Sequence, residues 1–250
     1  MSEVLQGVMI PFIGTSLGAA CVFPMRKDIC PALERSLSGF AAGVMAAAGV
    51  WSLLIPATEG SAHMGRFAFL PAAVGLLMGT VFMMLLDKAI RSLCSKTASG
   101  LPKNTMLALA VTLHNIPEGM VVGVAFAGLR CGGGSITAAA AMALAMGIAI
   151  QNFPEGAMIS MPLKAEGMSR LRAFVIGVLS GVVEPIGAAV TLLAAGSVTS
   201  AMPYLLSLAA GAMFYVAAAE LIPEASRTDG GAAAFSAGFA VMMSLDVMFG

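Results

Sequence analysis

Long, unbroken apolar runs constrain this chain more than any other feature of its sequence. Each run is about twenty residues long, the length at which an α-helix crosses a bilayer, whereas a transmembrane β-barrel would show alternating segments of about ten residues. Apolar residues make up 59% of the chain and charged residues 10%, while soluble domains carry about 25% charged residues. We therefore expect an all-α membrane protein. The eight expected transmembrane helices cover residues 4–24, 36–56, 67–86, 105–127, 135–161, 171–194, 203–223 and 232–249.

Nothing in the composition predicts a separate soluble domain, so residues 1–250 are expected to form a single transmembrane domain. Thirteen Lys and Arg residues balance thirteen Asp and Glu residues. No basic field is therefore present to attract nucleic acid. The first apolar run lacks the basic segment that precedes the core of a signal peptide, and we expect it to remain as a helix.

The basic residues are distributed unevenly among the expected loops. Eleven of the thirteen Lys and Arg residues fall on one side of the membrane, and only Arg66 and Arg130 fall on the other. An excess of Lys and Arg marks the cytoplasmic loops. With an even number of helices, this asymmetry predicts that both termini lie outside, in a multi-pass protein of the cell (inner) membrane.

Two consecutive helices carry nearly the same polar motif. Residues 114–119 read HNIPEG in the fourth expected helix, and residues 151–156 read QNFPEG in the fifth. Consecutive membrane helices run in opposite directions, so the two copies form an inverted pair. Pro117 and Pro154 each lack an amide donor and leave the carbonyl four residues earlier without its usual partner. Such backbone is tolerated at membrane depth where it is buried or lines a cavity.

A weaker repeat relates the first three helices to the last three. Residues 41–45 (AAGVM) match residues 209–213 (AAGAM), and each match is followed by an Ile-Pro pair. A three-helix repeat in a membrane must be inverted, and secondary transporters built from inverted repeats bind substrate near the midplane. Shared Ala and Gly composition is the alternative explanation. The expected arrangement is therefore a 3+2+3 inverted repeat.

Three glutamates, Glu118, Glu155 and Glu184, fall near the middle of their expected helices. An ionisable residue at this depth costs about 2.5–3.5 kcal/mol on insertion scales. No Lys or Arg lies in the central part of any expected helix, so these carboxyls must be protonated or must receive a cation from solution. Glu220 lies nearer the cytoplasmic end of the seventh helix, where a ligand and a neutral, hydrogen-bonded acid both remain open interpretations.

The spacing within the motifs favours a metal cation. His114 and Glu118 are separated by four residues and therefore share one helix face, and an imidazole and a carboxylate can both reach one ion at about 2.0–2.2 Å. Gln151 and Glu155 repeat that spacing. The two Asn residues add carbonyl oxygens, although Asn in membrane helices also serves as interhelical glue. The candidate ligands are His114, Asn115, Glu118, Gln151, Asn152, Glu155 and Glu184.

Three further residues are weaker candidates. Met45 lies in the second helix and is either a soft ligand or ordinary membrane packing. Glu59 and His63 are four residues apart just outside the second helix. They form either a solvated loop or a metal-capture step.

The doubled motif resembles the ZIP family of divalent metal transporters, and the Gln of the second copy with Glu184-Pro185 resembles its GufA-type branch. The resemblance implies eight helices and two adjacent metal sites at the midplane. It also implies elevator-like movement of helices 1, 4, 5 and 6 against helices 2, 3, 7 and 8. The implied first site comprises His114, Glu118, Gln151, Glu155 and Glu184; the second comprises Asn115, Asn152 and the same three glutamates as bridges; and Met45 is an implied ligand from helix 2.

Two positions depart from the family pattern. Members often carry His-Glu in the seventh helix, where this chain has Ala219-Glu220, and the loop between the third and fourth helices contains no His. Both departures argue against a cytoplasmic sensing or exit site built from histidines.

The expected function is transport of a divalent transition metal, above all Zn²⁺, toward the cytoplasm. One imidazole with several oxygen donors also suits Cd²⁺, Mn²⁺ and Fe²⁺. No enzyme is expected, because the chain lacks the H-E-x-x-H motif of a membrane zinc protease, and no organic cofactor is expected. The alternatives are a proton-coupled carrier of an organic solute, with the glutamates as a proton relay, and channel-like permeation of the same ion. The expected partners are metal ions and the lipid bilayer, with a homodimer left open.

Overall fold

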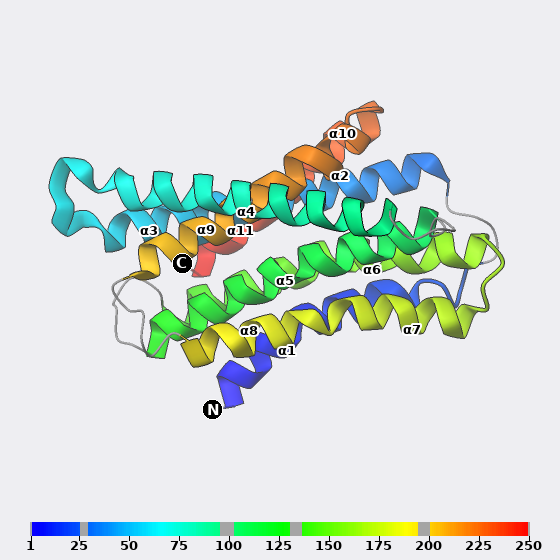
Figure 1. Cartoon of the computed structure of the whole chain (residues 1–250), viewed down its shortest axis with the longest axis horizontal. Coiled ribbons are helices and arrows are strands. Elements are labelled where there is room, and N and C mark those ends of the chain that lie inside the picture. Colours follow the sequence, from blue (N-terminus) through cyan, green and yellow to red (C-terminus); the bar gives the residue numbers. More distant parts are fainter. Residues whose placement is uncertain (1, 26–29, 96–102, 131–136, 195–200, 250) are drawn as a thin grey trace.

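The computed structural model describes residues 2–25, 30–95, 103–130, 137–194 and 201–249. Across these ranges every regular element is a helix. The helices run roughly side by side as one bundle, and the two chain ends lie at the same end of it (Figure 1). The long helices are α1 (Ser2–Ala20), α2 (Pro31–Ala48), α4 (Phe69–Ser95), α5 (Lys103–Arg130), α6 (Ala138–Ala165), α7 (Arg170–Gly181), α8 (Val183–Ala194), α9 (Met202–Val216) and α11 (Asp229–Phe249).

Short helical segments extend or join the long ones. The π-helix η1 (Gly49–Leu54) connects α2 to α3 (Ile55–Gly60), and the π-helix η5 (Ala217–Leu221) connects α9 to α10 (Ile222–Ala225). The 3₁₀-helix η2 (Ala62–Phe67) then leads from α3 toward α4.

The helix ends differ from the expected bounds for local reasons. α1 ends at Ala20 rather than at residue 24, because the amides of residues 21–23 bond to carbonyls three residues earlier and Pro24 has no amide hydrogen. α4 continues from the expected residue 86 to Ser95. Asp87 on this extension accepts a hydrogen bond from the Tyr215 hydroxyl at 3.3 Å, which gives the charged turn a partner on α9.

The two Ile-Pro pairs adopt the same irregular geometry. Each directly follows a π-helical segment, and the Ile amide bonds to the carbonyl five residues earlier, from Ile55 to Val50 and from Ile222 to Ala217. A proline cannot supply the next amide and its ring crowds the preceding turn. A π-turn relieves that conflict. By contrast, α5 and α6 remain helical through Pro117 and Pro154.

α5 and α6 run through the middle of the bundle. α1, α7 and α8 lie on one side of them, and α2, α4, α9 and α11 lie on the other (Figure 1). The most extensive contacts pair α1 with α6, α8 with α5, α2 with α11, and α9 with α4. These pairs are close because glycines face carbonyls: a Cβ at Gly119 would collide with the Glu184 carbonyl, and one at Gly156 with the Thr15 carbonyl.

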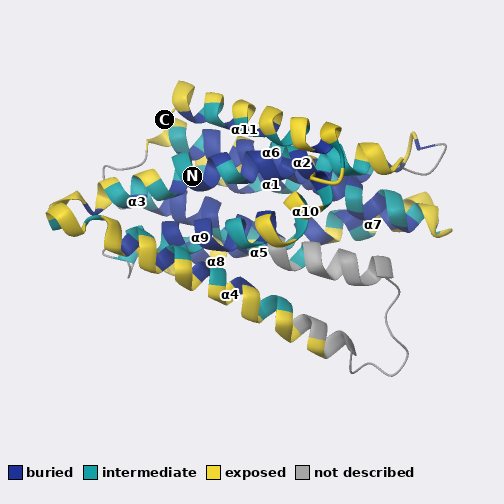
Figure 2. Cartoon of the chain, turned by 90° about the horizontal axis from the view of Figure 1, so that it is seen from above, coloured by how far each residue is buried: buried dark blue, intermediate teal, exposed yellow. Residues whose placement is uncertain are grey.

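The outermost helices present apolar side chains outward. α4 and α11 show mostly exposed residues on their outer faces (Figure 2), and on α4 these include Leu77, Met78 and Leu85. Large exposed apolar surfaces on long helices are expected where the surroundings are lipid. Six helical spans of the described ranges are long and apolar enough to cross a membrane, which confirms a helical, multi-pass membrane protein. These are Glu3–Ala20, Pro31–Gly60, Phe69–Ala89, Arg170–Ala194, Met202–Ala225 and Asp229–Phe249.

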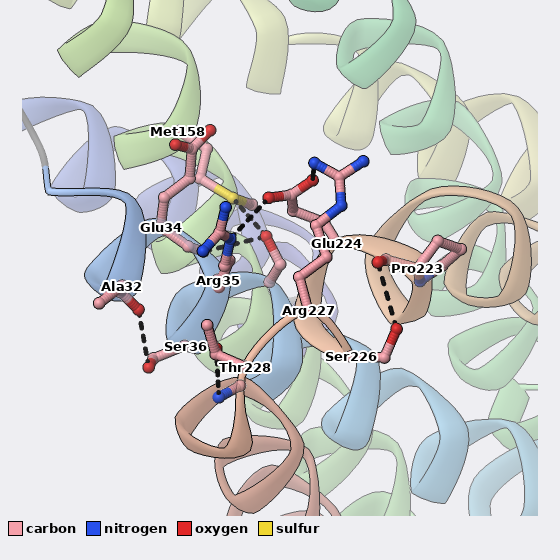
Figure 3. Close-up of polar contacts among 12 residues, drawn as sticks. Ala32, Glu34, Arg35, Ser36, Met158, Pro223, Glu224, Ser226, Arg227 and Thr228 are labelled. Carbon is pink, nitrogen blue, oxygen red and sulfur yellow. Dashed lines mark hydrogen bonds and ion pairs between the residues drawn. The ribbon is translucent and has the colours of Figure 1, made fainter.

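The end of the bundle opposite the termini carries a small ionic cluster. Glu224 of α10 accepts from the Arg35 Nε of α2 at 3.2 Å and from the Arg227 Nη1 at 2.9 Å (Figure 3). One turn further into the bundle, the Ser38 hydroxyl of α2 contacts the Met158 sulfur of α6 at 3.3 Å. Partly exposed ion pairs of this kind contribute about 0–1 kcal/mol. The cluster therefore links α2 to α10 but adds little to the stability of the fold.

Candidate metal site

The three predicted mid-membrane glutamates are all buried near the centre of the bundle. Glu118 of α5, Glu155 of α6 and Glu184 of α8 are at most 2% exposed. They approach one another because Gly119 lets α5 touch the backbone of α8 at Glu184. Glu118 lies close enough to both Glu155 and Glu184 for their charges to interact. The structure therefore brings together carboxyls that are up to 66 positions apart in the chain.

Glu118 and Gln151 join the two motifs directly. The Gln151 Nε2 donates a hydrogen bond of 2.7 Å to the Glu118 Oε1. The Glu118 Oε2 and the Gln151 Oε1 have no hydrogen-bond partner among the described residues. Each side chain therefore keeps one buried oxygen free for a cation.

Glu184 is held more tightly than the other two glutamates. Its Oε1 accepts from the Thr15 hydroxyl of α1 at 2.6 Å and from the Asn115 Nδ2 of α5 at 3.2 Å. The Asn115 Nδ2 also donates to the Ser180 carbonyl at 3.1 Å. That carbonyl lies beside the break at Val182 that separates α7 from α8 and places Glu184 in the first turn of α8. The Glu184 Oε2 has no partner in the described part of the chain.

Glu155 and Asn152 have more polar atoms without hydrogen bonds than the other residues of the cluster. Both carboxylate oxygens of Glu155 and both side-chain polar atoms of Asn152 lack hydrogen bonds within the described ranges. Asn152 lies beside Glu118 and Glu184. A buried polar atom without a partner costs about 1–3 kcal/mol, so several such atoms close together are typical of a ligand-binding site.

The donors of this site are mixed carboxylates and amides. Among the described side chains, no group of three His, Cys, Asp or Glu residues is close enough to hold an ion by itself. The amides of Asn115, Gln151 and Asn152 each lie next to at least one of the carboxyls, and all three residues are fully buried. The arrangement can thus bind a divalent cation through carboxylate and amide oxygens.

The predicted ligands outside this cluster have different surroundings. His114 lies on α5, but its side chain is outside the described residues. Met45 is buried in the main apolar cluster of the bundle, as a packing residue would be. Glu220 is half-buried in η5, where the π-turn brings it close enough to Glu155 for their charges to interact.

Glu59 and His63 do not share a helix face. α3 ends at Gly60, and His63 lies on the separate 3₁₀-helix η2. Both side chains are exposed. A spacing of four residues places two side chains on one face only within a continuous α-helix, and no such helix joins this pair. The structure therefore favours the solvated loop over a capture site formed by Glu59 and His63.

Two polar residues of the bundle were not identified from the sequence. Thr15 is fully buried on Glu184, yet a Thr in an apolar helix ordinarily bonds its own backbone, so its spacing carries no signal. Asp246 of α11 is 8% exposed, and its Oδ1 accepts from the Ser52 hydroxyl. An acidic residue close to the end of an apolar helix is the signal in the sequence that marks this position.

A cavity of about 290 Å³ opens near Asp246, at the end of the bundle that holds the termini. Glu59, Ser52 and Asp246 supply polar groups to its wall, and Trp51 and Leu144 are among its apolar residues. It lies between η1, α3, α5, α6 and α11.

The chain is similar to known zinc transporters over most of its length. The profile of the family described as ZIP zinc transporter matches residues 97–246. The chain is 34% identical to human zinc transporter ZIP11, with 99% of this chain and 97% of the relative covered. It is 35% identical both to zinc transporter GufA of Myxococcus xanthus (91% and 90% covered) and to zinc transporter ZIPB of Bordetella bronchiseptica (96% and 79% covered).

These matches confirm the resemblance that the doubled motif indicated. They extend over nearly the whole chain, and the profile includes both motif helices and Glu184. The chain with this buried cluster of carboxylates and amides therefore belongs to the ZIP zinc transporter family.

Proposed function

We propose that this protein carries Zn²⁺ or a similar divalent transition metal across the membrane toward the cytoplasm, through the buried cluster between α5, α6 and α8. The observation that carries this proposal is the set of free carboxylate and amide oxygens around Glu118, Glu155 and Glu184. Neither motif helix contains Lys or Arg between residues 104 and 129 or between residues 138 and 163. A cation from solution is therefore the natural counter-charge for the glutamates.

The cluster has enough donors for two adjacent ions. Three carboxylates supply a charge of about −3 against +4 from two divalent cations, which is close to balance in a buried site. Glu155 keeps both oxygens free, so we assign it the bridging position between the ions. His114 supplies the imidazole and Asn115, Gln151 and Asn152 supply amide oxygens, while Met45 is retained only as a weaker ligand from α2.

This set of ligands selects divalent transition-metal ions as a group and does not single out one metal. Carboxylate and amide oxygens with one imidazole suit Zn²⁺, and they also accept Cd²⁺, Mn²⁺ and Fe²⁺. We propose Zn²⁺ as the principal substrate, because the relatives covered over most of their length are named zinc transporters. The metal is the cargo, and no organic cofactor is required for its movement.

We also propose that α5 and α6 cross the membrane beside the six apolar spans, which gives eight crossings in a 3+2+3 inverted repeat with both termini outside. Two observations support the repeat: the pairing of α1 with α6 mirrors that of α8 with α5, and η1 and η5 recur before the two Ile-Pro pairs. The excess of Lys and Arg away from the termini supports the orientation in the cell (inner) membrane.

Direction and movement follow from two features of the bundle. The cavity beside Glu59 and Asp246 opens at the end that holds the termini, where acidic side chains attract cations. Among the described residues, the hydrogen bonds between the side chains of the cluster and their partners lie within α1, α5, α6, α7 and α8. The site can therefore shift as one unit against α2, α4, α9 and α11.

Uptake into proteoliposomes tests the proposal. The purified protein is reconstituted, and entry of Zn²⁺, Cd²⁺, Mn²⁺ and Fe²⁺ is followed under defined metal, proton and potential gradients. We expect Zn²⁺ uptake by the native protein and by Glu166→Gln, which changes an exposed loop carboxyl, and loss of uptake in Glu155→Gln. Proton flux with an organic solute but without metal movement would instead favour the proton-coupled carrier.

A further inference from the structure

Thr15 on α1 and Glu184 on α8 occupy equivalent positions, each against one of the two motif helices. The backbone carbonyl of Thr15 packs on Gly156 of the second motif, as the carbonyl of Glu184 packs on Gly119 of the first. One turn away, Gly18 packs on the Phe153 carbonyl, and Gly187 packs on the Ile116 carbonyl.

These contacts align Thr15 with Glu184 and Gly18 with Gly187. The same position thus carries a carboxyl on α8 and a hydroxyl on α1, and the two side chains contact each other directly.

Packing on both sides fixes the position of the Thr15 side chain. Thr15 is fully buried, and a Cβ at Gly181 would lie only 2.9 Å from the Thr15 Cβ and 3.0 Å from its Cγ2. The hydroxyl has a single proton. Its distance to the Glu184 Oε1 is 2.6 Å, against 3.4 Å to the Pro11 carbonyl of its own helix, so the carboxylate receives the proton.

The two hydrogen bonds on the Glu184 Oε1 limit which oxygen of this carboxylate can bind a metal. A carboxylate oxygen has about two lone-pair positions, and Thr15 and Asn115 occupy both of them. Only the Oε2 remains without a partner. Glu118 differs, because among the described residues its Oε1 accepts one hydrogen bond, from Gln151.

We propose that Thr15 is a positioning residue of the metal site, which restricts Glu184 to binding the metal through the Oε2 alone. This inference rests on the proposed function and adds a determinant of selectivity to it. A carboxylate limited to one oxygen keeps the coordination number low, which suits the small, usually four-coordinate Zn²⁺. Release of the second oxygen permits bidentate binding and higher coordination numbers, which suit larger ions.

The threonine also limits the charge of the site. A carboxyl at position 15, matching Glu184, would add a fourth negative charge to the buried cluster. Thr15 supplies a neutral donor at that place instead, so that the two halves of the site differ in charge although their backbones correspond.

Metal binding by three variants tests this role. Thr15→Val keeps the shape and removes the hydroxyl, Thr15→Ser keeps the hydroxyl, and Thr191→Val is the matched control. Thr191 is also buried, and its hydroxyl bonds only to the Gly187 carbonyl of its own helix at 2.9 Å. Zn²⁺ and Cd²⁺ affinities are measured by calorimetry on the purified proteins, and the metal–oxygen coordination number by X-ray absorption.

We expect Thr15→Val to shift the relative affinities away from Zn²⁺, because the released Glu184 Oε1 permits bidentate binding, which suits larger ions. Its Zn²⁺ to Cd²⁺ affinity ratio should fall and its coordination number should rise. Thr15→Ser and Thr191→Val should match the native protein. If Thr15→Val does not fold, Thr15→Cys replaces it, because a thiol is a weak donor of similar size.

Several outcomes would overturn the inference. The role of Thr15 is contradicted when the native protein binds Zn²⁺ and Thr15→Val keeps the native affinity ratio and coordination number. Equal losses in Thr15→Val and Thr15→Ser would show a packing role instead. Absence of Zn²⁺ binding by the native protein would contradict the proposed function itself, which keeps the two failures distinguishable.

Discussion

The Gln151 amide of α6 donates a 2.7 Å hydrogen bond to the Glu118 carboxylate of α5, so that the last charged residue of one motif touches the first residue of the other. This contact sets the relative register of the two helices at the centre of the bundle. The remaining Glu118 oxygen has no partner among the described residues. The contact therefore orients the carboxylate without using up its capacity to bind a cation.

Removal of a motif carboxylate should abolish metal binding. We expect Glu118→Ala and Glu155→Ala each to eliminate Zn²⁺ uptake while the protein still folds, because the two carboxylates are ligands in the proposed site and their burial is otherwise costly. Uptake in proteoliposomes and gel filtration are the measurements, with Glu166→Ala as the exposed control. Near-native uptake by either purified variant would contradict the two-motif site.

Enlargement of Gly119 should separate α5 from α8. A Cβ at this position collides with the backbone carbonyl of Glu184. A backbone atom cannot move aside as the end of a flexible side chain can. We expect Gly119→Ala to lower stability by about 1–3 kcal/mol, the usual cost of overpacking, and to reduce metal affinity as well. The melting temperature in detergent and calorimetry measure the two effects.

Gly230→Ala is the matched control for that substitution. Gly230 also lies in a helix, but the nearest atom to its added Cβ is the Ser36 hydroxyl oxygen at 3.6 Å. We expect no loss of stability, since Ala favours the helix more than Gly does. Equal melting temperatures for the two variants would show that α5 can move away from α8 freely.

Metal binding should release protons. Ionised carboxylates without a counter-charge are costly to bury, and metal ligands bind in their deprotonated forms. We therefore expect at least one proton to leave the protein on Zn²⁺ binding and the affinity to fall as the pH drops. Titration in two buffers of different ionisation enthalpy measures the number released. Identical heats in both buffers between about pH 6 and 7.5 would show that the empty site is already ionised.

Thiol labelling from one side of the membrane should report the orientation. In a background without the four native cysteines, we expect Ser2→Cys to react with an impermeant reagent added outside and Ala98→Cys to react only after the membrane is opened. The reason is the excess of Lys and Arg in the loops away from the termini. The reverse pattern would invert the proposed direction of transport.

Much of the candidate site was predictable because its residues repeat at short range. The motifs at residues 114–119 and 151–156 predicted Glu118, Gln151, Asn152 and Glu155 as one cluster, and the structure places these four side chains together in the core. Glu184 was predictable from its depth in an apolar helix. By contrast, the spacing of Glu59 and His63 left a solvated loop and a metal-capture step both open, and the structure ends helix α3 at Gly60, between the two residues.

The sequence by itself determined the class of fold and the side chains of the candidate site, since apolar runs of membrane length, glutamates without basic neighbours and a doubled motif are all local patterns. The tertiary structure alone decided which oxygen of Glu184 is free and which helix restrains it. Thr15 and Glu184 lie 169 positions apart, and no periodicity relates them. Their contact depends on the close approach of α1, α5, α6, α7 and α8 at Gly119, Gly156 and Gly181. Such packing is set by the whole bundle rather than by any one helix.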